Sequence, residues 1–277
     1  MKKLMMTLAA GLFATAVVAE VTSANVVGYQ TITLTNGYNM LAVNFATPGA
    51  PAAAMLINDL LPSGSNKVTA AGLTGKTTPT GADQVRVWNV SGAYENYFLF
   101  RNALVPTNTK NYLWCSATSP YPVATNTTFK TGDALWFTFV GTKTTFTFAG
   151  EVPNNVAQTK TLVAGYNMLG AGFAADWDLN AIGTNVWSGA DFTGKTTPTG
   201  ADQVRVWKTD TQSYKDYFLF RNSLVPTNTK NFKWCSSVSP YPVTTGADII
   251  PMASAVWFIK AKAGTCQFAP QIPYTLQ

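Results

Sequence analysis

Apolar and polar residues alternate along much of the chain in short runs that are typical of β-strands. In residues 85–88 (Val-Arg-Val-Trp) the side-chain character alternates as expected for a half-buried strand. Residues 135–140 and 144–148 are rich in aromatic and β-branched residues, and they flank Gly141. This arrangement predicts a hairpin whose turn lies at Gly141.

Turn and helix signals complete the pattern. Residues 31–34 form a strand-like run that leads into Asn36 and Gly37, a favoured turn dipeptide. Prolines interrupt the apolar runs further along and indicate loops. Helix signals are scarce: residues 52–61 are the best candidate, and residues 178–182 are a weaker counterpart.

The chain repeats itself at domain scale, with a spacing of roughly 120 residues rather than the 20 to 50 of a solenoid. Residues 37–41 recur as 165–169, residues 74–88 recur unchanged as 193–207, and residues 94–123 return as 214–243 with seven substitutions. We therefore predict two tandem homologous domains, residues 20–153 and 154–277. Each is expected to be a β-sandwich or a small barrel, which makes the protein all-β.

The first 19 residues have the features of a secretory signal peptide. Met1, Lys2 and Lys3 precede an apolar run over residues 4–18, and Ala19 follows as a small residue. The apolar run is shorter than the about 20 residues that span a bilayer. An uncleaved anchor helix is the alternative. We expect a secreted protein at the extracellular cell surface, with no membrane span after signal cleavage.

The repeated motifs resemble those of an uncharacterised family of secreted, repeat-containing β proteins of planctomycete and verrucomicrobial-type bacteria. The resemblance rests on Gly-x-Asn-x-Leu at residues 37–41 and 165–169, on Phe-Ala-Gly-Glu-Val-Pro at residues 148–153, and on Val-Gly-Tyr at residues 27–29. It implies a surface or extracellular location. It brings no catalytic residues with it.

Composition argues against several functional classes. Histidine is absent, which excludes His-dependent nucleophilic sites and removes the commonest zinc ligand. The matched carboxylates Asp83 and Asp202 belong to different domains and make no catalytic pair. Removal of the signal peptide leaves 17 basic and 13 acidic residues, a net charge of +4 without a basic cluster. We expect no enzyme, no metal, no cofactor and no nucleic-acid partner.

The most conspicuous polar feature is the loop at residues 76–84, which recurs unchanged at 195–203. Core packing gives no reason for polar loop residues to match so closely. Recent duplication or a loop dictated by the fold would explain the match, and so would a contact surface. We name one candidate ligand or assembly surface on this basis: Lys76, Asp83 and Arg86, with Lys195, Asp202 and Arg205.

Matched aromatic residues are the second candidate feature. Trp88 and Trp207 are the pair of interest among six matched aromatic positions. Large aromatic side chains usually fill the core of a β domain. The alternative is a platform that stacks sugars, with Asp83, Arg86 and Asn102 as hydrogen-bond partners.

The three cysteines are disulfide candidates, and because their number is odd, at least one of them is free or paired with another molecule. Cys115 and Cys235 are equivalent, whereas Cys266 has no counterpart. A Cys235–Cys266 bridge, a link from Cys115 to a neighbouring subunit, and free buried thiols are the alternatives.

Two functions are consistent with these features. In the first, the protein is a structural subunit of an extracellular fibre, sheath or surface layer, and it self-assembles through strand contacts that involve residues 20–34. In the second, it holds tandem carbohydrate-binding modules, or is an adhesin, with polysaccharide as partner.

Overall fold

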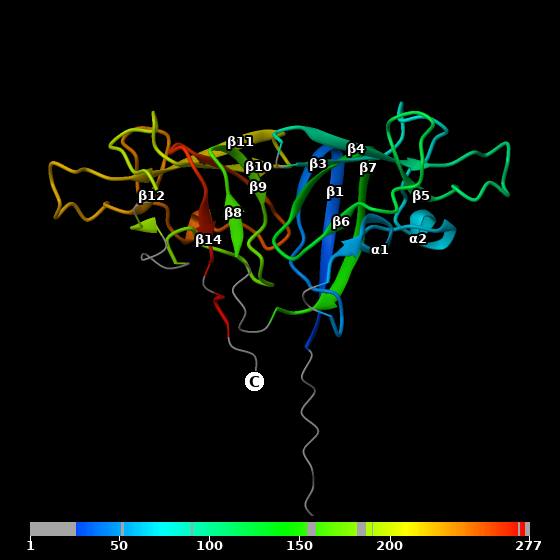
Figure 1. Cartoon of the computed structure of the whole chain (residues 1–277), viewed down its shortest axis with the longest axis horizontal. Coiled ribbons are helices and arrows are strands. Elements are labelled where there is room, and N and C mark those ends of the chain that lie inside the picture. The colour runs from blue at the N-terminus through cyan, green and yellow to red at the C-terminus, as the bar shows by residue number, and fades with distance from the viewer. Residues whose placement is uncertain are drawn as a thin grey trace, which may run out of the picture.

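The computed structural model describes residues 26–50, 53–89, 91–153, 159–181, 187–189, 191–270 and 272–274. Strands account for 42% of these described residues and helices for 6%, and the strands form antiparallel sheets (Figure 1). The predicted all-β, sandwich-like class is confirmed. The predicted signal peptide, residues 1–19, lies outside the described residues.

The first sheet has five strands in the order β1-β7-β3-β4-β5. Their bounds are β1 Val27–Ala42, β7 Ala134–Glu151, β3 Gln84–Trp88, β4 Tyr94–Phe100 and β5 Leu113–Ser116. A short strand pair, β2 (Met55–Leu56) with β6 (Thr128–Phe129), and the helices α1 (Ile57–Leu60) and α2 (Ser65–Ala70) lie beside it (Figure 1).

The second sheet has the order β12-β11-β10-β13-β9. From the centre of the molecule outwards, its strands β9, β13, β10, β11 and β12 are the counterparts of β1, β7, β3, β4 and β5. Their bounds are β9 Gly165–Leu169, β13 Val256–Lys260, β10 Gln203–Lys208, β11 Ser213–Phe220 and β12 Lys233–Ser236. The pair β8 (Lys160–Leu162) with β14 (Cys266–Phe268) and the 3-10 turn η1 (Gly246–Asp248) complete this half.

The turns expected at Asn36-Gly37 and at Gly141 are wrong. Both segments lie inside long strands, β1 and β7, which pair over almost their whole length with a register shift between Thr35 and Gly37. Gly37 has a φ of +90°, and the Asn36 amide donates to the carbonyl oxygens of Val140 and Gly141. The Asn-Gly dipeptide therefore builds a bulge rather than a hairpin turn.

The repeated Gly-Tyr-Asn motif has the same local structure in both sheets. The buried Asn39 amide accepts from the Thr35 N–H at 3.0 Å and donates to the Thr35 carbonyl at 2.9 Å. Asn167 makes the same two bonds with Val163, each at 2.8 Å. The motif therefore satisfies backbone groups that the bulge removes from the ladder.

The helix predicted over residues 52–61 is reduced to the four-residue α1, since the preceding residues 55–56 pair as a strand. The counterpart predicted over residues 178–182 is a turn as far as the described residue 181. Both segments are too short to form a stable helix without packing.

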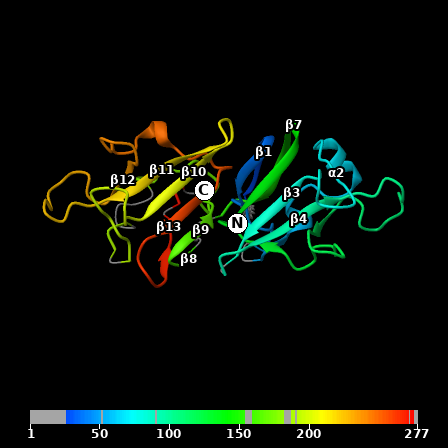
Figure 2. The same cartoon turned by 90° about the horizontal axis from the view of Figure 1, so that it is seen from above.

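The two sheets meet side by side at the centre of the molecule (Figure 2). The Ala42 N–H donates to the Ala253 carbonyl, and the Gly170 N–H donates to the Gly132 carbonyl, both at 2.9 Å. Ala42 and Gly170 each follow the Gly-Tyr-Asn-Met-Leu motif of their own half. The contact therefore has a local pseudo-twofold symmetry.

Candidate functional site

Eight aromatic rings line the junction of the two sheets, and we call this set the aromatic seam. Its members are Tyr38, Trp88, Tyr94 and Trp136 from the first half, and Tyr166, Trp207, Tyr214 and Trp257 from the second. Trp136 and Trp257 are buried, Trp88 and Trp207 are half-buried, and the tyrosines reach the surface.

The ring geometry repeats closely on the two sides. The Trp88–Tyr94 and Trp207–Tyr214 centroids are each 4.9 Å apart. The pairs that cross the junction are Trp88–Trp257 at 5.2 Å and Trp136–Trp207 at 5.1 Å. All four pairs meet edge to face, which is a favoured arrangement for aromatic rings.

Each half-buried tryptophan also donates a hydrogen bond to the opposite sheet. The Trp88 indole N–H donates to the Tyr166 carbonyl oxygen at 3.2 Å, and that of Trp207 donates to the Tyr38 carbonyl oxygen at 2.8 Å. Both acceptors belong to the repeated Gly-Tyr-Asn motif. Trp88 and Trp207 therefore hold the two sheets together, rather than filling the core of one domain.

Two open hollows lie along the seam. The first, of about 210 Å³, is lined by Tyr38, Arg86, Tyr94, Trp136, Trp207 and Tyr214. The second, of about 260 Å³, is lined by Trp88, Tyr94, Tyr166, Arg205, Tyr214 and Trp257. Tyr94 and Tyr214 line both, so the hollows adjoin each other at these two side chains, and we call the pair of hollows the trough.

The tyrosines offer accessible ring surface in this trough. Tyr38 is 40% exposed, Tyr94 38% and Tyr166 49%. Burial of the ring raises the pKa of Tyr94 and of Tyr214 above the ordinary value, so both hydroxyls are protonated at neutral pH. The trough therefore presents neutral hydroxyls and flat apolar surface.

The two arginines of the predicted surface line this trough, one in each hollow. Arg86 lies directly opposite Asn96 in the β3–β4 ladder, and Arg205 lies opposite Asp216 in the β10–β11 ladder. The Arg86 guanidinium carbon is 5.5 Å from the Tyr38 ring centre. The structure thus brings Trp88, Trp207 and both arginines together at one site.

The other predicted surface residues do not belong to the trough. Asp83 and Asp202 are completely buried, so their assignment to a ligand or assembly surface is wrong. Asp83 accepts from the backbone N–H groups of Thr74 and Val140, and Asp202 makes the equivalent bonds in the second sheet. These carboxylates fix the repeated loop, which is a structural reason for its identity.

Lys76 and Lys195 are exposed at the start of the repeated loops, and neither lines the hollows. Their backbones are held by the adjoining strand, because the Lys76 N–H donates to Leu99 and the Lys195 N–H donates to Leu219. Asn102, the other predicted sugar partner, accepts from the backbone N–H groups of Leu104 and Val105. The Asn102 side chain therefore stabilises the turn in which it lies.

The three cysteines are free and buried, so the predicted Cys235–Cys266 bridge is wrong; a link from Cys115 to a neighbouring subunit stays a prediction, which its complete burial disfavours. Cys235 and Cys266 lie in different apolar clusters, and Cys115 lies in a third. Burial raises the pKa of the Cys115 thiol to about 11 and raises the pKa values of Cys235 and Cys266 as well. The free-thiol alternative is the one that fits.

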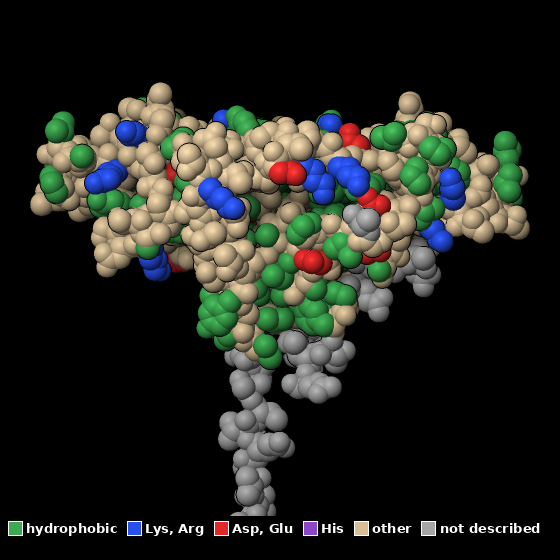
Figure 3. All heavy atoms as spheres, turned by 180° about the vertical axis from the view of Figure 1, so that it is seen from behind, with side chains coloured by type: hydrophobic (Ala, Val, Ile, Leu, Met, Phe, Trp, Pro, Cys, Tyr) green, Lys and Arg blue, Asp and Glu red, His purple; other side chains and the backbone are tan. Residues whose placement is uncertain are grey.

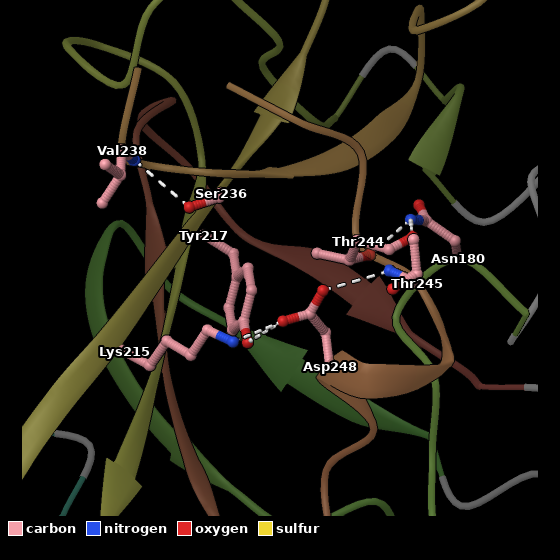
Figure 4. Close-up of polar contacts among 8 residues, drawn as sticks. All are labelled: Asn180, Lys215, Tyr217, Ser236, Val238, Thr244, Thr245 and Asp248. Carbon is pink, nitrogen blue, oxygen red and sulfur yellow. Dashed lines mark hydrogen bonds and ion pairs between the residues drawn. The ribbon is translucent and has the colours of Figure 1, made fainter. Parts of the chain in front are cut away.

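A second polar cluster lies in the second half of the molecule, around Asp248 (Figure 4). The Asp248 carboxylate contacts Lys215 and accepts from the Tyr217 hydroxyl at 3.1 Å. Burial and then the Asp248 charge raise the pKa of Tyr217 to about 12. A tyrosine base needs a lowered pKa, so this cluster ties η1 to β11 and does not prepare a reactive group.

Sequence reasoning found Trp88, Trp207 and both arginines, with Tyr94 and Tyr214 among the matched aromatic residues, but it missed Tyr38 and Tyr166. Tyr38 and Tyr166 occur in the repeated Gly-Tyr-Asn motif, where the Tyr alternates with buried residues and so faces outward. That outward aromatic residue, repeated in both halves, was the available signal.

Among the described residues no group of three or more metal-ligating side chains gathers, and no helix has the length and apolarity to cross a membrane. Comparison with protein-family models, with curated proteins and with solved structures gave no match.

Proposed function

We propose that this chain is a secreted, non-enzymatic glycan-binding protein whose ligand lies in the aromatic trough. The observation that supports the proposal is the pair of contiguous hollows with exposed tyrosine rings and an arginine in each. Amphipathic rings contact the apolar faces of sugar rings, while their hydroxyls and the guanidinium groups suit sugar hydroxyls. The family resemblance noted above would agree with a surface location.

The trough favours an extended ligand. Each hollow is smaller than the roughly 300–1,000 Å³ that encloses a drug-sized molecule. A chain of sugar rings suits both hollows, since they adjoin each other at Tyr94 and Tyr214. Both sheets build this one site, so the geometry favours a shared trough over two independent modules.

The test is a titration of tryptophan fluorescence with soluble polysaccharides. Trp88 and Trp207 lie in the trough, so a bound glycan should change their emission. Tyr94→Ala should weaken binding at least tenfold, because Tyr94 lines both hollows. Tyr29→Ala is the matched control, since Tyr29 is 72% exposed on β1 and lines neither hollow.

Circular dichroism should show that both variants keep the β fold of the parent protein. Failure to bind any of a broad set of acidic and neutral polysaccharides would overturn the proposal. Equal binding by the Tyr94→Ala variant and the parent protein would place the ligand elsewhere.

Self-assembly into an extracellular fibre or layer is a second candidate, and the edge of β1 favours it. The outer edges of both sheets are closed by the bridges Cys115–Val123 and Cys235–Val243. Along residues 27–35 of β1, the described part of the chain pairs with β7 alone. Such an unpaired edge can accept a strand from another molecule.

Exposed apolar side chains accompany this edge. Val26, Val27 and Tyr29 are 40–72% exposed. In the view of Figure 3, apolar side chains gather at the lower end of the molecule, whereas basic side chains are scattered. Negative-stain microscopy of residues 20–277 at high concentration is the test. Filaments that Val27→Lys with Tyr29→Lys abolishes would support assembly, and dispersed particles would contradict it.

A further inference from the structure

The two hollows of the trough differ in charge although their ring geometry is alike. Arg86 and Arg205 hold equivalent positions, each paired across the ladder with a buried tryptophan on one side. On the other side they differ, because Asn96 faces Arg86 and Asp216 faces Arg205. One difference between the two copies, Asn96 in the first and Asp216 in the second, therefore changes the charge beside the arginine of a hollow.

In the second hollow the arginine is neutralised within the protein. The Arg205 Nε–H donates to the Asp216 carboxylate at 2.9 Å, and the two form an ion pair. This hydrogen bond raises the pKa of Arg205 further. The guanidinium carbon lies 4.4 Å from the Tyr214 ring centre, so the group lies over this ring of the wall.

In the first hollow the same atom has no partner. The Arg86 Nε is buried, and the described residues give it neither a hydrogen bond nor an ion pair. A buried donor without a partner destabilises the folded protein unless a ligand supplies the acceptor. Asn96 is exposed and carries no charge to offset the guanidinium. This hollow therefore holds an uncompensated positive charge beside exposed tyrosine rings.

Resting on the proposed glycan-binding function, we infer that the Arg86 hollow binds the carboxylate of an acidic sugar, whereas the Arg205 hollow accepts a neutral sugar. The ligand class is a uronic-acid-containing polysaccharide. A carboxylate forms paired, charge-assisted hydrogen bonds with a guanidinium, and this geometry is specific to arginine.

The shape of the trough selects a sugar chain over other anions. A free phosphate would meet Arg86 but would leave the Tyr38 and Tyr94 rings without a contact. A small aromatic acid would occupy one hollow and would not reach the second. A polysaccharide with carboxylates along it supplies a negative charge, an apolar ring face and the length to span both hollows.

The experiment uses an acidic probe and its neutral counterpart. Oligogalacturonate is the acidic probe, and the same oligomer with its carboxylates methyl-esterified is the neutral one. Binding of each is measured by calorimetry at low salt and at high salt. We expect the parent protein to bind the acid about tenfold more tightly than the ester, and this preference should shrink at high salt.

The duplication supplies matched variants. Asn96→Asp gives Arg86 the partner that Arg205 already has, and it should remove the preference for acid while the affinity for the ester stays unchanged. Asp216→Asn frees Arg205 and should strengthen binding of the acid several-fold. Arg86→Gln is a second route to the loss of preference, and thermal melting confirms that each variant is folded.

The outcomes separate the two proposals. If acid and ester bind equally and Asn96→Asp changes nothing, the assignment of an acidic sugar is overturned while glycan binding in the trough stands. If neither probe nor any polysaccharide binds, both proposals are overturned. A tenfold preference for acid that disappears in Asn96→Asp and persists in the Tyr29→Ala control supports both.

Discussion

Ala42 and Gly170 lie against each other where the two sheets meet, and a Cβ on Gly170 would be 2.7 Å from the Cβ of Ala42. Both residues follow the same Gly-Tyr-Asn-Met-Leu motif, so they are equivalent positions of the repeat. Ala42 is completely buried. The junction therefore has room for one methyl group, and the two halves cannot both carry alanine without a shift.

Exchange of these two residues tests the geometry of the junction. Gly170→Ala should lower the free energy of unfolding by about 1–3 kcal/mol, because it overpacks the contact. Ala42→Gly should cost about 1 kcal/mol. In the double variant the methyl moves to the other side, so the loss should be smaller than the sum of the two.

Denaturant unfolding measures all three variants, with Gly246→Ala as a control. A Cβ on Gly246 would meet no atom within 4 Å, and this variant should be nearly neutral. Strict additivity of Ala42→Gly and Gly170→Ala would contradict the close approach.

The indole hydrogen bonds across the junction make a second prediction. Trp207→Phe keeps a ring in place but removes the donor to the Tyr38 carbonyl, and it should cost about 1 kcal/mol of unfolding free energy. Trp88→Phe should cost less, since its bond to Tyr166 is longer. Guanidinium titration of each variant provides the measurement, and a larger effect for Trp88 would argue against this reading of the two bonds.

The strands could be predicted because alternation reports a half-buried sheet directly. The alternation in residues 85–88 agrees with strand β3. The strands that pair with β3, which are β7 and β4, are known only from the fold. The Asn36-Gly37 dipeptide was misread because a turn and a bulge use the same residues. What distinguishes them is the bond from Asn36 to Val140 and Gly141, more than 100 residues away.

The site was predictable only in part for the same reason. Repetition and size drew attention to Trp88 and Trp207, but their shared site exists only when the two sheets pack together. Exact repetition of the loop also singled out Asp83, although its carboxylate is buried and bonded to backbone. Identity between repeats thus marked both the residues of the aromatic trough and a structural anchor, and burial was needed to tell them apart.

The three cysteines should not react with thiol reagents in the folded protein. Burial raises the pKa of Cys115 to about 11, so little thiolate forms at pH 8 and the sulfur is shielded from reagents. A thiol reagent should label none of the three cysteines in native protein and all of them in denaturant. Rapid native labelling, or a covalent dimer on a non-reducing gel, would contradict this arrangement.

The buried carboxylate of Asp83 makes stability depend on pH. Burial raises its pKa to about 6, although the N–H groups of Thr74 and Val140 oppose the shift. Burial raises the pKa of Asp202 as well. Between about pH 4 and pH 6 the folded state therefore binds more protons than the unfolded state. The unfolding free energy should fall as pH rises through this window, by about 2–3 kcal/mol for Asp83.

Asp83→Asn should flatten this profile, because the amide does not ionise. The variant also loses one of the two backbone bonds, so its stability should be lower at pH 4, and the difference from the parent protein should narrow towards pH 7. Denaturant midpoints at pH 4, 5, 6 and 7 provide the measurement. Asp59→Asn changes an exposed carboxylate and is the control for net charge. A parent-like slope in Asp83→Asn would show that this carboxylate does not set the pH dependence, whereas a flattened slope in that variant alone assigns it to the buried loop anchor.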